Sequence, residues 1–109
     1  MSKLFYDHLI ALENVEDLVR NAIESAEERE ELWGIVDEMI HHRAVGCVLN
    51  ALHEEHHHDF LCLLNAAPAD KRIIEFINHR IDDQIEELIA TEMKLLEEEL
   101  IRMVKSDQL

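Results

Sequence analysis

Histidine and carboxylate side chains gather in the middle of this chain. Six of its eight histidines fall within residues 41–58, namely His41, His42, His53, His56, His57 and His58. Glu54, Glu55 and Asp59 lie among them or directly beside them. Imidazole and carboxylate groups are the ligands of many transition-metal sites. Imidazole also has an unperturbed pKa close to neutral pH, so the same residues can form a pH-sensitive patch or simply a polar helix face.

Three Glu-x-x-His spacings favour a metal site shared between helices. The pairs are Glu38–His41, Glu54–His57 and Glu55–His58. Residues three apart on a helix share a face, so both side chains of a pair can reach one ion. Di-iron proteins of the ferritin-like class use this motif from two helices and one further glutamate from each of two others, for which Glu24, Glu75 and Glu92 are candidates. The motifs lie only seventeen residues apart, which is too close for two full-length antiparallel helices.

A mononuclear zinc, nickel or copper site is the other metal candidate. His53 and His57 lie four residues apart. His58 and Cys62 have the same spacing, and either pair can supply two ligands from one helical face. A closed structural site needs four ligands, so a second copy of the chain would have to supply the others. Taken together, the predicted metal ligands are Glu38, His41, His53, Glu54, His57 and His58.

Catalytic chemistry finds little support in the sequence. Cys47 lies between Gly46 and Val48 in an apolar stretch, whereas reactive thiols need an electropositive setting. The chain contains no glycine-rich phosphate loop, nucleophile elbow or dinucleotide-binding fingerprint. We therefore expect a protein that is not an enzyme and has no cofactor. A bound transition-metal ion, with metal-dependent redox chemistry, is the alternative.

The charge balance restricts the partners. The formal net charge is −15 with the histidines neutral, so a nucleic-acid backbone or an anionic membrane would be repelled, whereas a basic protein surface or a cation is compatible. The N-terminus shows no signal peptide, and no apolar run approaches the roughly 20 residues of a transmembrane helix. Cys47 and Cys62 show no CxxC spacing. We therefore expect a cytoplasmic protein with reduced thiols that binds neither nucleic acid nor membrane.

The elements that position these residues are predicted to be helices throughout. Hydrophobic residues make up 48% of the chain, and only two glycines and one proline occur. Leu, Ala, Glu and Met are prominent and are good helix formers, and 109 residues suffice to bury a core. The predicted fold is all-α, an irregular bundle of four to five helices with a long C-terminal amphipathic helix, in a single domain over residues 1–109.

The N-terminal half divides at two capping signals. Apolar spacing predicts a short helix over about residues 4–12, and Asn14 can start a second one. A single bent helix over residues 2–24 fits the pattern equally well. Ser25, with a glutamate three residues later, is a capping box, and it predicts a long helix that continues to a break near His53.

Three further helices are predicted in the C-terminal half, over about residues 55–65, 68–79 and 83–106. The only proline of the chain suits the first turn of the second of these helices. Asp82 and Asp83 suit the N-terminus of the third.

A homodimer is expected from the length of the last helix. At roughly 1.5 Å per residue it is about 35 Å long, which is more than the two short helices before it can cover. Part of its apolar stripe is therefore predicted to meet a second copy of the chain. The substitution Ile89→Glu is then expected to weaken the dimer.

An apolar and acidic pattern runs through the second half, from Leu49 onward. It consists of Leu52, Glu54, Glu55, Phe60, Leu61, Leu64, Ile74, Phe76, Ile77, Ile81 and Asp82. This pattern resembles that of a group of small uncharacterised helical domains of candidate-phyla bacteria. The resemblance implies a helical fold with no assigned activity, and the consecutive histidines at positions 56–58 depart from it.

The sequence as a whole predicts a small acidic helical protein that acts as a non-enzymatic protein–protein interaction or structural domain. The alternative is a His/Glu-rich protein that binds Fe, Zn or Ni, with a ferritin-like protein as the most remote form of this alternative. The histidine segment is interpreted first as a pH-sensitive elbow between helices and second as a metal site.

Overall fold

The computed structural model describes residues 4–6, 9–10 and 13–107 of the chain. Its helices are α1 (Glu13–Ala22), α2 (Ala26–Ala51), α3 (His57–Ala66), α4 (Arg72–Asn78) and α5 (Ile85–Asp107), with the 3-10 turn η2 (Glu54–His56) before α3. The described residues contain no strand. The predicted all-α class, with a long C-terminal helix, is therefore confirmed.

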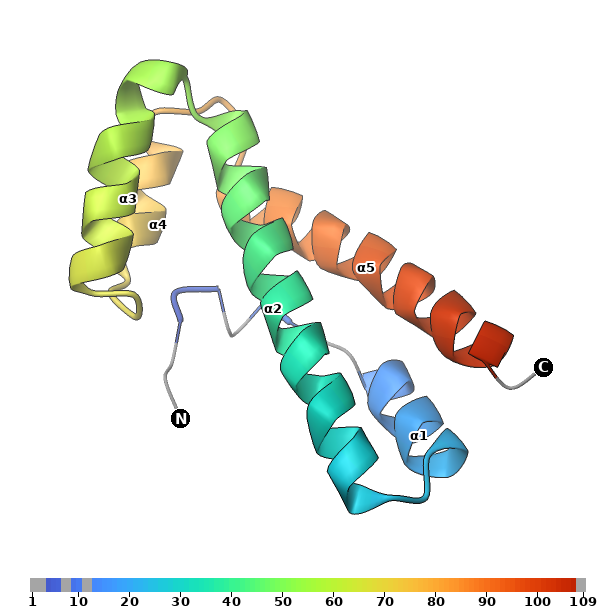
Figure 1. Ribbon diagram of the computed structural model, residues 1–109. Helices are drawn as coiled ribbons and strands as arrows, with labels where there is room; N and C mark the ends of the chain where they lie inside the picture. The colour runs from blue at the N-terminus through green and yellow to red at the C-terminus, as the bar shows by residue number, and fades with distance from the viewer. Residues whose placement is uncertain (1–3, 7–8, 11–12, 108–109) are drawn as a thin grey trace.

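Helices α2 and α5 form the frame of the fold and diverge from one end like the arms of a V (Figure 1). The buried residues of α2 are spaced four apart and continue into its C-cap: Val36, Ile40, Ala44, Val48 and Leu52. Those of α5 are Ile85, Ile89, Met93, Leu96 and Leu100. The α5 row includes one step of three residues, from Met93 to Leu96. The two rows belong to one hydrophobic core, and α2 and α5 are in contact.

Helix α1 fills the space where α2 and α5 separate, and its Val15 and Val19 are buried. A short link then leads to Ser25, whose Oγ accepts a hydrogen bond from the Glu28 backbone N–H at 3.4 Å. The predicted start of α2 at Ser25 is thus confirmed. The other predicted cap, Asn14, lies inside α1, because this helix already begins at Glu13.

The helix predicted over residues 4–12 is not present in the described part of that segment. Phe5 and Tyr6 form a turn and are both buried. The Phe5 N–H donates to the Pro68 carbonyl at 2.8 Å, and its ring meets the Phe60 ring edge-on with centroids 6.2 Å apart. The apolar spacing here therefore reflects a segment held by contacts with α3 and the loop after it. The described residues before α2 do not form one continuous helix.

Helices α3 and α4 form a hairpin beside the C-terminal part of α2 (Figure 1). The predicted break near His53 is confirmed, because α2 ends at Ala51 and α3 follows only after η2. The helix predicted over residues 68–79 begins later, at Arg72. Asp70 explains the delay: its Oδ1 accepts a hydrogen bond from the Arg72 backbone N–H at 2.9 Å, which closes a turn before the helix.

Helix α5 begins at Ile85, and its N-terminal cap comes from the preceding helix. The Asn78 Oδ1 accepts a hydrogen bond from the Ile85 N–H at 2.8 Å, and its Nδ2 donates to the Glu86 Oε1 at 2.7 Å. Asn78 therefore takes the role that the sequence assigned to Asp82 and Asp83. This contact also fixes the position of α4 relative to α5.

The buried row of α5, from Ile85 to Leu100, is covered within its own chain, by α2 along its N-terminal part and by α1 further on. Ile89 is 0% exposed. Ile89 is therefore a core residue and does not report on a dimer contact, whereas Leu95 and Met103 of the same helix are exposed. Homodimerisation itself stays a prediction.

Candidate functional site

The predicted metal ligands are spread over three successive elements. Glu38 and His41 are exposed on α2, His53 follows its C-cap, Glu54 opens η2, and His57 and His58 open α3. Within the described residues, no three His, Cys, Asp or Glu side chains are grouped so that they could hold a metal ion. The Glu-x-x-His motifs are therefore not brought together inside one chain.

His57 closes the C-terminal end of α2. Its Nε2 lies 2.7 Å from the Leu49 carbonyl oxygen and 2.9 Å from the Leu52 carbonyl oxygen. Both neighbours are acceptors, so Nε2 carries the proton and donates to them. The last carbonyls of a helix lack partners within the helix, and this imidazole supplies one. The role of His57 is thus to fix the elbow between α2 and α3.

His41 holds the N-terminal segment against α2. The Tyr6 hydroxyl and the His41 Nδ1 share a hydrogen bond of 2.8 Å, with the two rings tilted and their centroids 6.0 Å apart. Tyr6 is buried, whereas His41 is largely exposed. The imidazole therefore satisfies the polar end of a buried tyrosine, which is a common requirement for that residue.

Among the predicted ligands, His58 lies close to a thiol on the same helix. Its Nε2 lies 3.6 Å from the Cys62 Sγ, and both residues are exposed. They line a depression of about 600 Å³ together with Leu4, His41, Leu61, Leu64, Asn65 and Pro68. The structure thus places His41 and His58 on the same depression. His53 and His56 instead lie 3.9 and 3.4 Å from the exposed Glu55 carboxylate.

An apolar groove at the open end of the V was not predicted from the sequence. It has a volume of about 310 Å³ and is lined by Val15, Val19, Ala22, Ile23, Leu32, Val36, Leu100, Met103 and Val104. All nine side chains are apolar, and they come from α1, α2, α5 and the residue after α1. A signal was present, because the apolar spacing of the last helix continues to Val104, beyond Leu100, which is the last buried residue.

Helices α2 and α5 also carry exposed apolar side chains, of which Met103 lines this groove. Ile35 is 55%, Leu95 46% and Met103 53% exposed. Between the two helices, Arg43 pairs with Glu92 at 3.3 Å and also with Glu99. The exposed apolar side chains of α2 and α5 therefore occur together with charged side chains, including this ion-paired group.

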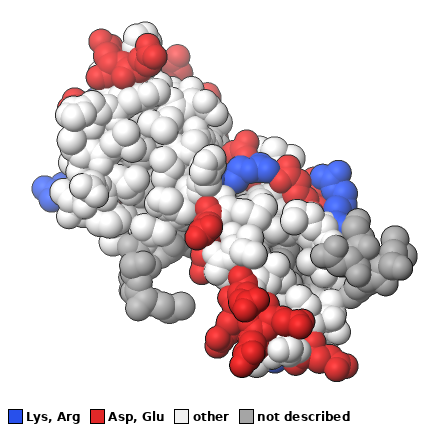
Figure 2. Space-filling view, in the orientation of Figure 1, with Lys and Arg blue, Asp and Glu red and all other residues white. Residues whose placement is uncertain are grey.

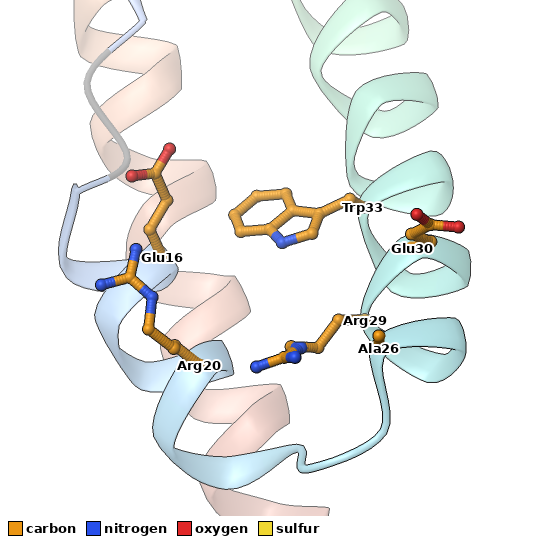
Figure 3. Close-up of a pocket in the computed structure, with 6 residues that line it drawn as sticks. All are labelled: Glu16, Arg20, Ala26, Arg29, Glu30 and Trp33. Carbon is orange, nitrogen blue, oxygen red and sulfur yellow. The ribbon is translucent and has the colours of Figure 1, made fainter.

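A second pocket, of about 550 Å³, lies between α1 and α2 (Figure 3). Its lining residues are Glu16, Arg20, Ala26, Arg29, Glu30 and Trp33. The half-buried Trp33 indole projects from α2 toward α1. Two arginines and two glutamates balance in charge, so this pocket does not select a charged ligand.

The two cysteines differ in their surroundings. Burial raises the pKa of the Cys47 thiol, and the nearby Glu92 carboxylate raises it further. A raised pKa reduces the thiolate that nucleophilic chemistry and metal binding require. Cys62, in contrast, is exposed beside an imidazole. Of the two thiols, Cys62 is therefore the one placed to meet a ligand.

In the described part of the chain, no helix combines the length and the apolar character needed to cross a membrane. The chain matches no protein-family model, no curated protein and no solved structure. Its resemblance to small helical domains of candidate-phyla bacteria therefore stays a prediction.

Proposed function

We propose that this protein is a non-enzymatic interaction module whose groove between α1, α2 and α5 binds an amphipathic helix of a protein partner. The observation that carries this proposal is the groove itself, which is lined only by apolar side chains and bordered by the exposed Met103. Apolar surface that remains exposed in contiguous patches marks interaction sites more often than scattered apolar residues do.

The shape of the groove favours a helix over a small cofactor. Its volume of about 310 Å³ is at the lower end of the range for ligand pockets, and no polar side chain lines it to orient a small molecule. An amphipathic helix needs only a row of apolar contacts at positions spaced three and four residues apart. Met103, which lines the groove, is 53% exposed and is therefore accessible to such a helix.

The charge of the chain favours a basic partner helix. The α1–α2 end of the fold, which contributes Ile23 and Leu32 to the groove, also carries the exposed side chains of Glu24, Glu27 and Glu28. Figure 2 shows acidic side chains gathered at this end. Lysine and arginine residues beside the apolar stripe of a partner would be attracted to this rim, which raises the association rate and selects against acidic helices. Both cysteines are unpaired, which fits a partner in the reducing cytoplasm.

A pair of synthetic peptides tests this proposal. Each peptide is a helix of about five turns with leucine at helical spacing. One peptide carries lysine and the other glutamate at the remaining positions. Isothermal titration calorimetry measures binding to the full chain. We expect the Leu/Lys peptide to bind at least tenfold more tightly, a difference of about 1.4 kcal/mol.

Met103→Glu and Leu63→Glu separate groove binding from general charge attraction. Both substitutions add one negative charge at an exposed apolar position, but Leu63 lies on α3, outside the groove. We expect Met103→Glu to weaken binding of the Leu/Lys peptide by about tenfold or more. Leu63→Glu should leave the affinity for this peptide unchanged or slightly higher. Equal affinity of both variants, or no binding of the Leu/Lys peptide, would refute the groove as the binding site.

A further inference from the structure

The exposed side chains of His58 and Cys62 on α3 bring an imidazole nitrogen and a thiol sulfur within 3.6 Å of each other. We propose that two copies of this chain share one Zn²⁺ ion, held by the His58 Nε2 and the Cys62 Sγ of each copy. This inference goes beyond the proposed groove function and uses a different surface. It also gives the expected homodimer a defined contact.

The distance between the two donor atoms fits a tetrahedral zinc ion. Zinc binds thiolate sulfur at roughly 2.3 Å and imidazole nitrogen at about 2.0–2.1 Å, so two such ligands at a tetrahedral angle lie about 3.5–3.6 Å apart. The His58 Nε2 and the Cys62 Sγ are 3.6 Å apart. The residues are four apart within α3, so the helix keeps both side chains on one face. Both are exposed, so small rotations suffice to turn the two donor atoms toward a common ion.

One chain supplies only half of such a site. Structural zinc sites are four-coordinate and closed, and the described residues contain no third metal-binding side chain grouped with this pair. His41 lies on the same depression, but its Nδ1 is bonded by Tyr6. A second copy related by a two-fold axis supplies the two missing ligands and completes a Cys₂His₂ site.

The surroundings of the pair allow two copies to approach. Residues 57–69 contain a single charged residue, Asp59, in a chain whose net charge is −15. The lobe formed by α3 and α4 is mainly white in Figure 2, apart from acidic side chains at its top and a basic one at its edge. Leu61, next to the pair, is 44% exposed. Contact between copies here therefore avoids most of the acid–acid repulsion that other faces would meet.

The charges and protons of the proposed site balance. Each Cys62 thiol loses one proton when its sulfur binds the metal, so one Zn²⁺ releases two protons from the two chains. The resulting centre has two thiolates, two neutral imidazoles and one divalent cation, and is neutral. Zinc binding is therefore expected to become tighter as the pH rises.

The test uses the full chain purified without a nickel column and freed of metal with EDTA. Zn²⁺ is then added in steps, while light scattering measures the mass and elemental analysis measures the bound zinc. We expect one zinc ion per two chains, a doubling of the mass from 12.8 kDa, and reversal by EDTA. Cobalt in place of zinc should show the absorption of a tetrahedral thiolate complex.

Matched variants assign the ligands. Cys62→Ser and His58→Ala should each abolish the zinc-dependent doubling, whereas Cys47→Ser and His53→Ala should retain it. Circular dichroism shows whether each variant remains helical. One zinc ion per chain without a change in mass, a dimer that persists undiminished in EDTA, or equal effects of Cys62→Ser and Cys47→Ser would each overturn the proposal. None of these outcomes affects the peptide test of the groove, because the two surfaces share no residue.

Discussion

Asn78 is expected to be the most important polar residue for the stability of the fold. Its side chain caps α5 by accepting a hydrogen bond from the Ile85 N–H and donates to the Glu86 carboxylate. It belongs to α4, so one side chain links two helices across the turn. The substitution Asn78→Ala removes these two hydrogen bonds and a longer one from its Nδ2 to the Gln84 Oε1 at 3.3 Å, and it leaves the first turn of α5 without its cap.

The expected loss follows from the two interactions. Removing an N-cap side chain costs about 0.5–2 kcal/mol. The hydrogen bond to the Glu86 carboxylate adds about 1 kcal/mol, because that carboxylate is partly exposed and water replaces much of the interaction. We expect Asn78→Ala to lower the free energy of unfolding by roughly 1–3 kcal/mol. For a domain of about 100 residues, each 1 kcal/mol lowers Tm by about 4–8 °C.

Urea unfolding followed by far-UV circular dichroism measures this loss. Asp82→Ala and Asp83→Ala are the matched controls, because both residues are exposed in the same turn and were the caps predicted from sequence. Each control should change the free energy of unfolding by less than about 0.5 kcal/mol. Asn78→Asp keeps the acceptor oxygen but places a second negative charge beside Glu86, so its loss should be intermediate. A control that costs as much as Asn78→Ala would refute the assignment of Asn78 as the cap of α5.

Two further results are expected. Ile89→Glu should abolish cooperative unfolding, because it places an unpaired carboxylate in a position that is 0% exposed; a variant that keeps a wild-type Tm would show that this face of α5 is not buried. Iodoacetamide at pH 8 should alkylate Cys62 several-fold faster than Cys47, since a raised pKa leaves less Cys47 thiolate at that pH. Mass spectrometry of the two peptides measures the ratio, and faster modification of Cys47 would contradict its assignment as the half-buried thiol.

The interior of the long helices could be predicted from sequence because it depends on local spacing. The buried row of α2 repeats every four residues, and the capping side chain of Ser25 lies within one turn of the amide that it binds. Both signals are contained in a short stretch of sequence. The beginnings of α4 and α5 could not be predicted in the same way. They depend on Asp70 and Asn78, whose side chains bind the backbone across turns that the apolar spacing does not specify.

The N-terminal segment shows a second limit of apolar spacing. Phe5 and Tyr6 are apolar at positions that suit a helix, yet they are buried in a turn. Their positions depend on contacts with Pro68 and His41, which are distant in sequence. Apolar spacing over residues 4–12 therefore could not distinguish a helix from a turn held by tertiary contacts.

The histidine segment shows why residue spacing alone overestimates a metal site. The argument from positions three or four apart holds only while the backbone stays helical. Leu52 has extended dihedral angles, with φ −82° and ψ 140°, and His53 is also extended, so the helix is interrupted inside the segment. The spacings that begin at residues 53, 54 and 55 therefore cross from an extended residue or a 3-10 turn into α3 and lose their common face. The His58–Cys62 spacing lies wholly within α3, and it is there that an imidazole nitrogen and a thiol sulfur come within 3.6 Å.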